Sequence, residues 1–217
     1  MDQNKLNQQS NYWENNFSSK PKMFGLDPSA AAINALKKFK DENIDEIIEL
    51  GAGLGRDTIF FAKNKIKVEA LDYSQTAIKI IEKKAKDNNF SKLISTKHFD
   101  VRGRLPYEDN SIKGVFSHML YCMALTNAEI KKLNNELFRI LKPGGINIYT
   151  VRNISDGDYM KGTYIGEDMY ENEGFIINFF SEKKVNSLLK GFNNLSISKF
   201  EEGSFPRKLF LVQNKKT

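Results

Sequence analysis

Short apolar runs alternate with longer amphipathic stretches along most of this chain. The amphipathic stretches include Gln75–Asn88 and Ala128–Leu141, where apolar side chains recur at helical spacing. Strands alternating with helices are typical of a parallel sheet, so the pattern predicts an α/β fold. The runs that we interpret as strands are Ile44–Leu50, Lys67–Asp72, Lys92–Phe99, Ser111–Met119 and Ile146–Val151.

The end of the chain has a different pattern. Leu195–Glu201 and Lys208–Val212 are apolar or alternating runs, joined through Gly203–Pro206, and they predict an antiparallel hairpin that closes the sheet. Polar residues that can cap a helix precede each helical stretch. The predicted caps are Asp27, Ser74, Asn127 and Ser181.

Two stretches lack a regular pattern. Met1–Asn11 is polar, and we expect it to be flexible. Arg152–Phe180 contains four glycines and six aromatic residues without a period that indicates a helix or a strand. A loop this long in a compact domain is usually functional, and it follows a strand whose carboxyl end faces the expected ligand crevice. We therefore predict that residues 152–180 recognise a substrate, although an ordinary surface excursion is the alternative.

The sequence IIELGAGLGRD, residues Ile47–Asp57, is the centre of the chemistry. It reads as a strand that turns directly into a helix reaching Lys63. Glycines at alternate positions can adopt positive φ and admit a ligand against the backbone, beside the unpaired N–H groups of the helix. The spacing is G-x-G-x-G, and Arg56 stands where the dinucleotide fingerprint requires its third glycine. A nicotinamide dehydrogenase is therefore disfavoured.

Acidic residues end the next two predicted strands. Asp72 lies about twenty residues beyond the glycines, where a carboxylate takes the hydroxyls of a nucleoside ribose. Asp100 follows the third strand, although a carboxylate there could also serve a turn. The residues favour an adenosine-containing ligand.

Four motifs in register carry a family resemblance. ELGAGLG, then Asp72, then Phe99–Val101, then LKPGG at Leu141–Gly145 resemble the class I S-adenosylmethionine-dependent methyltransferases over roughly Ile44–Val151. The resemblance implies a Rossmann-like, doubly wound, mostly parallel seven-stranded sheet with helices on both faces and an antiparallel C-terminal hairpin. It implies S-adenosylmethionine as cofactor. We expect residues 1–217 to form one methyltransferase domain.

The resemblance also implies roles for single residues. Asp100 would accept a hydrogen bond from the adenine amino group, and the Val101 N–H would donate to the adenine ring. The implied cofactor-binding residues are Glu49, Gly51, Ala52, Gly53, Gly55, Arg56, Asp72, Tyr73, Asp100, Val101 and Ser117.

His118 stands at the carboxyl end of the fourth strand, where the methyl group must lie. We predict that it is catalytic, as a general base for an amine or hydroxyl acceptor, with a structural histidine as the alternative. The family often has a Phe-Asp pair before this strand, and this chain has Ile112–Gly114 instead. His98 lies inside a predicted strand and is interpreted as structural.

The first forty residues contain an aromatic segment ahead of the first strand. In methyltransferases that act on thiols, tellurite and thiopurines, a similar W…F…PS segment forms a lid over cofactor and acceptor. The resemblance implies such a lid at residues 1–40, and the alternative is that the aromatic residues close one end of the sheet. The predicted substrate contacts are Trp13, Phe24, Tyr121, Arg152, Tyr164, Phe175 and Arg207.

Composition narrows the class of protein. The 217 residues suffice for one core, and the net charge of +6 comes with lysines scattered along polar faces. That distribution argues against a nucleic-acid partner. The single cysteine, Cys122, excludes an internal disulfide and a cysteine-cluster metal site, and its apolar neighbours favour a buried thiol. We expect no metal, no membrane span and a cytoplasmic location.

Three functions remain open from the sequence. The first is an enzyme that methylates a small molecule. The second is a methyltransferase for RNA or protein, and the third is a cofactor-binding protein without catalysis. The pattern fixes neither the atom that accepts the methyl group nor the oligomeric state.

Overall fold

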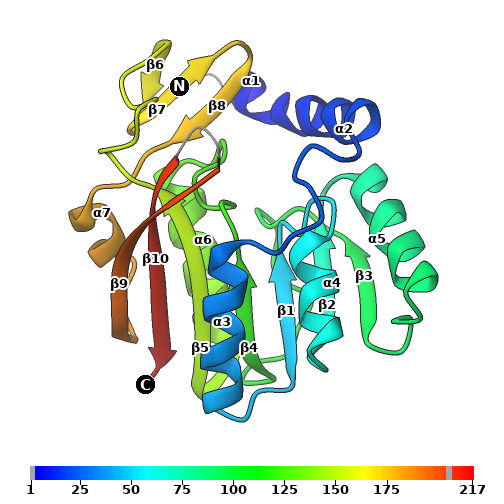
Figure 1. The fold of residues 1–217 in the computed structure, drawn as a ribbon. Helices are drawn as coiled ribbons and strands as arrows, with labels where there is room; N and C mark the ends of the chain where they lie inside the picture. Colours follow the sequence, from blue (N-terminus) through cyan, green and yellow to red (C-terminus); the bar gives the residue numbers. More distant parts are fainter. Residues whose placement is uncertain (1–2, 204–206) are drawn as a thin grey trace.

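A computed structural model describes residues 3–203 and 207–217 and shows a seven-stranded sheet in the order β3-β2-β1-β4-β5-β10-β9 (Figure 1). The first five strands run parallel, and β10 pairs antiparallel with both β5 and β9. The predicted fold class is confirmed. The bounds are β1 Glu46–Leu50, β2 Lys67–Asp72, β3 Ile94–His98, β4 Ile112–Ser117, β5 Leu141–Arg152, β9 Phe192–Glu202 and β10 Arg207–Lys216.

Helices cover both faces of the sheet. Neighbouring strand residues point to opposite faces, so Ile47 packs in one core and Ile48 in the other. Both faces bury apolar side chains, which explains why the strands are apolar throughout. One face is covered by α3 Ala30–Asp41, α4 Arg56–Lys63 and α5 Gln75–Asp87, and the other by α6 Asn127–Ile140 and α7 Glu182–Ser187.

Two predicted helix caps are wrong by one or two residues. Ser29, not Asp27, caps α3, and its backbone N–H and hydroxyl both donate to the buried Asp57 carboxylate. Thr126, not Asn127, caps α6, because Glu129 stands three residues later and completes a capping box. The structure confirms the other two predicted caps, Ser74 and Ser181.

The two stretches without a pattern are ordered. The prediction of a flexible N-terminus is wrong from residue 3, because α1 (Gln3–Asn7) and α2 (Gln9–Ser19) fill it; Met1 and Asp2 lie outside the described residues. The predicted irregular loop at 152–180 holds a three-stranded antiparallel sheet. Its strands are β6 Thr163–Gly166, β7 Met169–Asn172 and β8 Phe175–Asn178.

These two additions pack on each other above the carboxyl ends of the parallel strands (Figure 1). Leu6 of α1 shares an apolar cluster with Met169 and Ile176 of the small sheet. The Gln9 side chain donates to the Gly174 carbonyl at 2.8 Å and accepts from the Ile176 N–H at 3.1 Å. We call residues 3–19 and 163–178 the roof. Contacts between these two segments therefore order them, although neither sequence alone has a pattern that predicts its structure.

The closing hairpin is present as predicted, with β9 and β10 longer than the sequence indicated. Residues 204–206 of its predicted turn lie outside the described residues. Since β10 runs antiparallel to β5, the register pairs Leu209 with Arg152, and Arg207 pairs with Glu202. Glu202 and Arg207 therefore stand at the same edge as the carboxyl ends of β4 and β5.

Cys122 is fully buried, and its thiol donates to the Met119 carbonyl at 3.1 Å. Burial raises the pKa of this thiol to about 11, so it is protonated at neutral pH. Among residues 3–203 and 207–217, no helix is long and apolar enough to span a membrane. The same residues contain no group of three His, Cys, Asp or Glu side chains placed to ligate a metal.

Candidate active site

The glycine turn links β1 to α4 as the sequence predicts. Gly51, Gly53 and Gly55 have φ of 68°, 53° and 75°, a region that favours glycine. At Gly55 a Cβ would lie 2.7 Å from Ile81 Cγ1, so this glycine lets α4 begin close against α5. The third glycine is needed for packing. In the G-x-G-x-G spacing it stands at position 55, one residue before the third glycine of the dinucleotide fingerprint would fall.

Asp72 is joined directly to this turn. Its carboxylate accepts from the Gly53 N–H and from the Ser74 N–H, both at 2.8 Å. Burial raises the pKa of Asp72 to about 6, although both N–H groups favour the ionised form. The carboxylate thus lies at the end of β2, against the turn where the sequence expects a ribose.

Glu49 and Ala52 lie in the buried part of the same turn. Glu49 accepts a hydrogen bond from the Thr58 hydroxyl at 2.6 Å, and burial raises the pKa of its carboxyl well above the usual range. The Ala52 N–H donates to the carbonyl of Leu71 in β2. Both residues therefore fix the shape of the turn.

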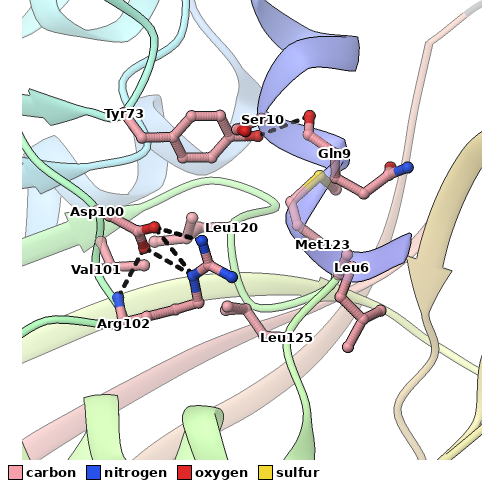
Figure 2. Close-up of a pocket in the computed structure, with 11 residues that line it drawn as sticks. Leu6, Gln9, Ser10, Tyr73, Asp100, Val101, Arg102, Leu120, Met123 and Leu125 are labelled. Carbon is pink, nitrogen blue, oxygen red and sulfur yellow. Dashed lines mark hydrogen bonds and ion pairs between the residues drawn. The ribbon is translucent and has the colours of Figure 1, made fainter. Parts of the chain in front are cut away.

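Asp100 is paired with Arg102 just beyond β3 (Figure 2). The Arg102 Nε donates to both oxygens of Asp100, at 3.1 and 2.9 Å, and Nη2 donates at 2.6 Å. Burial opposes ionisation, but the guanidinium outweighs it and lowers the pKa of Asp100. The Arg102 Nη1 also donates to Asn7 of α1 at 2.6 Å. Asp100 is therefore ionised and connected to the roof.

A pocket of about 40 Å³ lies beside this pair. Tyr73, Asp100, Val101 and Arg102 form one side, as Figure 2 shows, and roof residues form the other. Pockets for small-molecule ligands measure about 300–1,000 Å³. If adenosine binds beside Asp100, as the family resemblance implies, the roof has to move first. The remaining lining residues are Leu6, Gln9, Ser10, Leu120, Met123, Ala124 and Leu125.

Aromatic side chains of the N-terminal segment cover the glycine turn. A Cβ at Gly53 would lie 3.6 Å from Phe24 and 3.7 Å from Phe17. The Trp13 ring contacts both phenylalanines and meets Phe175 of β8 edge to face at 5.3 Å. The structure therefore brings three predicted substrate contacts, Trp13, Phe24 and Phe175, into one cluster above the turn.

Glu14 of α2 attaches the roof to the end of β2. Its carboxylate accepts from the Ser74 hydroxyl and from the hydroxyl and N–H of Thr76, at the start of α5. Burial opposes ionisation, but these hydrogen bonds lower the pKa of Glu14. A carboxylate at a helix N-terminus also interacts favourably with the helix dipole. The roof is thus held beside Asp72.

His118 lies directly after β4, where the sequence places it. Its Nδ1 is 2.9 Å from the hydroxyl of Thr150 in β5, and that hydroxyl accepts from the Met119 N–H. Thr150 is fully buried, so its hydroxyl proton needs a hydrogen-bond acceptor within the protein. Among the described residues, that acceptor is Nδ1 of His118. This arrangement favours the tautomer of His118 that carries its proton on Nε2, the nitrogen that faces Glu202. Burial, with the charges of Arg56 and Arg207, lowers the pKa of His118 to about 3, so the ring is neutral.

Glu202 and Arg56 complete this corner of the site. The Arg56 Nη2 donates to Glu202 Oε1 at 2.7 Å, and His118 Nε2 lies 3.7 Å from the same oxygen. Arg56 thus comes from the start of α4, His118 from the end of β4 and Glu202 from the end of β9. The structure brings together two predicted residues and one that the sequence did not single out.

The other predicted acceptor contacts are separated. Arg152 is buried and paired with Asp156 and Asp158. Tyr164 is 59% exposed on β6. Arg207 is exposed at the start of β10. Of these three predicted contacts, Arg207 is the one whose charge lowers the pKa of His118.

Ser117 and Tyr121 lie in the core beneath this edge. Both are fully buried, and the Tyr121 ring stacks on Tyr149 with centroids 4.4 Å apart. Neither residue lines the pocket beside Asp100. In this structure both side chains belong to the core and are not exposed to a ligand.

Sequence reasoning missed four residues of this region. Glu14 and Arg102 connect the roof to the strand ends, Leu120 lies against Gly51, and Glu202 faces His118. A signal existed only for Glu202, because it precedes the predicted turn at Gly203–Pro206 and lies five residues before the predicted contact Arg207. The other contacts depend on how the roof packs.

Residues 47–145 match the family model described as a methyltransferase domain. This stretch runs from β1 into β5 and includes the glycine turn, Asp72 and Asp100. This part of the chain is therefore similar to a methyltransferase domain, in line with the resemblance that the sequence motifs indicate.

Curated relatives match part of this chain. Two phosphoethanolamine N-methyltransferases of Triticum aestivum are each 40% identical over 100 residues, or 46% of this chain. The match covers 20% of one relative and 19% of the other. The chain spans about a fifth of the length of the curated relatives that it matches.

Solved structures share the whole fold. The 1,6-didemethyltoxoflavin-N1-methyltransferase of Burkholderia thailandensis, solved with 1,6-didemethyltoxoflavin and S-adenosylhomocysteine, superposes with a TM-score of 0.75 over 96% of this chain and 87% of its own, at 14% identity. A methyltransferase from Methanosarcina mazei gives 0.70 over 88% and 99%, at 20% identity. At these identities the likeness establishes the fold.

Proposed function

We propose that this protein transfers a methyl group from S-adenosylmethionine to a small-molecule acceptor. The observation that carries the proposal is the hydrogen bond from the Gly53 N–H to the Asp72 carboxylate, with Asp100 beside them. The three residues lie at the ends of three neighbouring strands of the sheet. These residues lie inside the stretch that matches the methyltransferase domain. Two acids and a glycine turn at one sheet edge suit the ribose, the adenine and the amino-acid part of the cofactor.

The donor groups fit that cofactor. Asp72 would accept hydrogen bonds from the ribose hydroxyls, and Asp100 would accept one from the adenine amino group while the Val101 N–H donates to the ring. Gly51 and Gly53 would let the amino-acid part lie against the backbone. The Arg56 guanidinium, at the start of α4, would bind its carboxylate through Nη1 while Nη2 stays on Glu202. Each role uses a group that stands at the carboxyl edge of the sheet.

The sulfonium supplies the activated methyl group, so the protein needs to supply alignment and a dry environment. The aromatic cluster of Trp13, Phe17 and Phe24 covers the turn and can interact with a cation through its rings. A closed roof would exclude water from the same place. A roof that closes over the bound cofactor would restrict access to the site, which favours small-molecule acceptors over RNA or protein.

The acceptor would lie between His118, Glu202 and Arg207. Arg207 is an exposed cation for which the described residues provide no salt-bridge partner, and it suits an acceptor with an anionic group. The curated relatives are named for phosphoethanolamine, which carries such a group. His118 donates through Nε2 in this arrangement, so its part is to orient the acceptor and not to remove its proton.

Thermal unfolding with S-adenosylhomocysteine, S-adenosylmethionine and NAD tests the cofactor. A ligand at a hundred times its dissociation constant adds about 2.7 kcal/mol, which raises the midpoint by roughly 5 to 10 °C for a domain of this size. We expect that rise with the two adenosyl ligands. A rise with NAD alone would refute the proposal. Release of S-adenosylhomocysteine from S-adenosylmethionine and candidate acceptors then tests turnover.

A further inference from the structure

One carboxylate oxygen of Glu202 is buried without a hydrogen-bond partner among the described residues. Oε1 is held by Arg56 at 2.7 Å and faces His118 Nε2 at 3.7 Å. Oε2 is inaccessible to solvent and has no hydrogen-bond partner in the described part of the chain. Buried carboxylate oxygens are normally paired, because removing them from water without a partner is costly. An unpaired acceptor at the expected methyl-transfer edge indicates a ligand that donates a hydrogen bond there.

Arg56 fixes this orientation. The guanidinium also contacts the Phe24 carbonyl at 3.4 Å, so it links the start of α4 both to the N-terminal segment and to β9. The side chain of Glu202 is 19% exposed and that of His118 is 12% exposed. Because His118 Nε2 and Glu202 Oε1 are 3.7 Å apart, a small molecule bound against His118 would lie close to the Glu202 carboxylate.

We propose that Glu202 binds the nucleophilic nitrogen of an amine acceptor, and that this protein is an N-methyltransferase. The inference rests on the proposed methyltransferase function. Oε2 would accept the acceptor's N–H, while Arg56 holds Oε1 and the His118 Nε2–H borders the same space. Glu202 touches the substrate in this arrangement, and Arg56 and Thr150 act as positioning residues.

The charge of the group explains the choice of nucleophile. A thiolate is an anion without a proton to donate, so the carboxylate would repel it. A hydroxyl can donate a hydrogen bond, but it needs a base to remove its proton as it reacts. The neutral His118 has its proton on Nε2 and cannot be that base from this side. An amine reacts through its lone pair and becomes more positive as it does so.

The bonds and charges balance without another reagent. The lone pair of the free amine forms the new bond to the methyl carbon as the bond from that carbon to sulfur breaks. The positive charge passes from sulfur to nitrogen, and the products are a methylated ammonium and neutral S-adenosylhomocysteine. The ammonium proton then leaves to Oε2 or to water. A carboxylate beside the nitrogen stabilises the charge that develops there.

Glu202→Gln tests the inference, with Glu201→Gln as the matched control. Glutamine keeps the size of the side chain but offers an N–H or a neutral oxygen to the acceptor. Glu201 is the preceding residue on β9, its side chain is 57% exposed, and it pairs loosely with Lys208 at 3.9 Å. Loss of a hydrogen bond to a charged group predicts that kcat/KM for amines falls roughly 10- to 100-fold in Glu202→Gln. The control should match the wild type.

The measured reaction is release of S-adenosylhomocysteine with three amines and two other nucleophiles. The amines are phosphoethanolamine, glycine and histamine, and the others are 2-mercaptoethanol and catechol. The dissociation constant of S-adenosylhomocysteine, which should stay within about twofold of wild type in both variants, shows that each variant is folded and binds cofactor.

The outcomes separate the two proposals. Amine methylation that drops in Glu202→Gln but not in Glu201→Gln supports the assignment. Methylation of the thiol or the catechol but of no amine overturns the amine assignment and leaves the methyltransferase function standing. No methylation of any amine also overturns it, and full amine activity in Glu202→Gln removes Glu202 from the role. Failure of wild type to bind either adenosyl ligand refutes the proposed function itself.

Discussion

Lowering the pH from 7 to 5 should weaken S-adenosylhomocysteine binding about tenfold through Asp72. Burial raises the pKa of this carboxyl from the usual 3.8 to about 6 in the free protein. Glu14 raises it further and His98 opposes the rise. If ribose hydroxyls bind the ionised form, affinity follows the ionised fraction, which is about 0.9 at pH 7 and about 0.1 at pH 5.

The same ionisation should change the stability of the free protein in the opposite direction. A carboxyl whose pKa is higher in the folded state than in the unfolded state favours folding when protonated. Its contribution is therefore present below about pH 4 and is lost as the pH rises towards 6. The difference between 3.8 and about 6 corresponds to about 3 kcal/mol, at 1.36 kcal/mol per pKa unit.

Both effects can be followed through Trp13, the single tryptophan, which lies in the roof. Fluorescence titration with S-adenosylhomocysteine and urea unfolding are run at pH 5, 6 and 7. Asp72→Asn should bind weakly at all three values and lose the dependence on pH. Asp57→Asn is the control, because Asp57 is also a buried aspartate but serves Ser29 at the start of α3. A wild-type affinity that is flat from pH 5 to 7, or a slope that survives in Asp72→Asn, would refute the ribose role.

Two further predictions concern the turn and the roof. Gly55→Ala should destabilise the protein by about 2–4 kcal/mol in urea unfolding, from its φ of 75° and the 2.7 Å approach to Ile81, whereas Gly157→Ala, with open space around it, should not. Gln9→Ala removes two hydrogen bonds, one from α2 to Gly174 before β8 and one to Ile176 in β8, and should speed S-adenosylhomocysteine association at least about fivefold in stopped-flow fluorescence. Ser18→Ala, on the exposed face of α2, should leave that rate unchanged, and equal rates for all three proteins would contradict the opening step.

The sheet and the glycine turn could be predicted because their signals are local. Ile47 and Ile48 must both be apolar if both faces of β1 are covered. Gly51, Gly53 and Gly55 each adopt the positive φ that their spacing implied. Information of this kind lies within a few residues and needs no knowledge of the partner elements.

The roof could not be predicted because its order comes from contacts distant in sequence. The strand β6 has four residues, and α1 has five with Leu6 as its buried side chain. Leu6 becomes buried only against Met169 and Ile176. Gln9 would read as an ordinary surface residue, yet it bridges α2 to the small sheet. Segments this short carry too little pattern to reveal a structure that depends on their neighbours.

The proposed cofactor contacts and several of the proposed acceptor contacts lie in different parts of the chain. The matched domain ends at residue 145, and the groups that would hold the cofactor lie within it. Trp13 and Glu202 lie outside it, on a segment before β1 and on a hairpin after β5. A sheet edge that receives its cofactor contacts from the matched strands, and several of its acceptor contacts from added segments, can change acceptor without changing cofactor. The unpaired oxygen of Glu202 is therefore a better guide to the acceptor of this chain than the stretch that matches the methyltransferase domain.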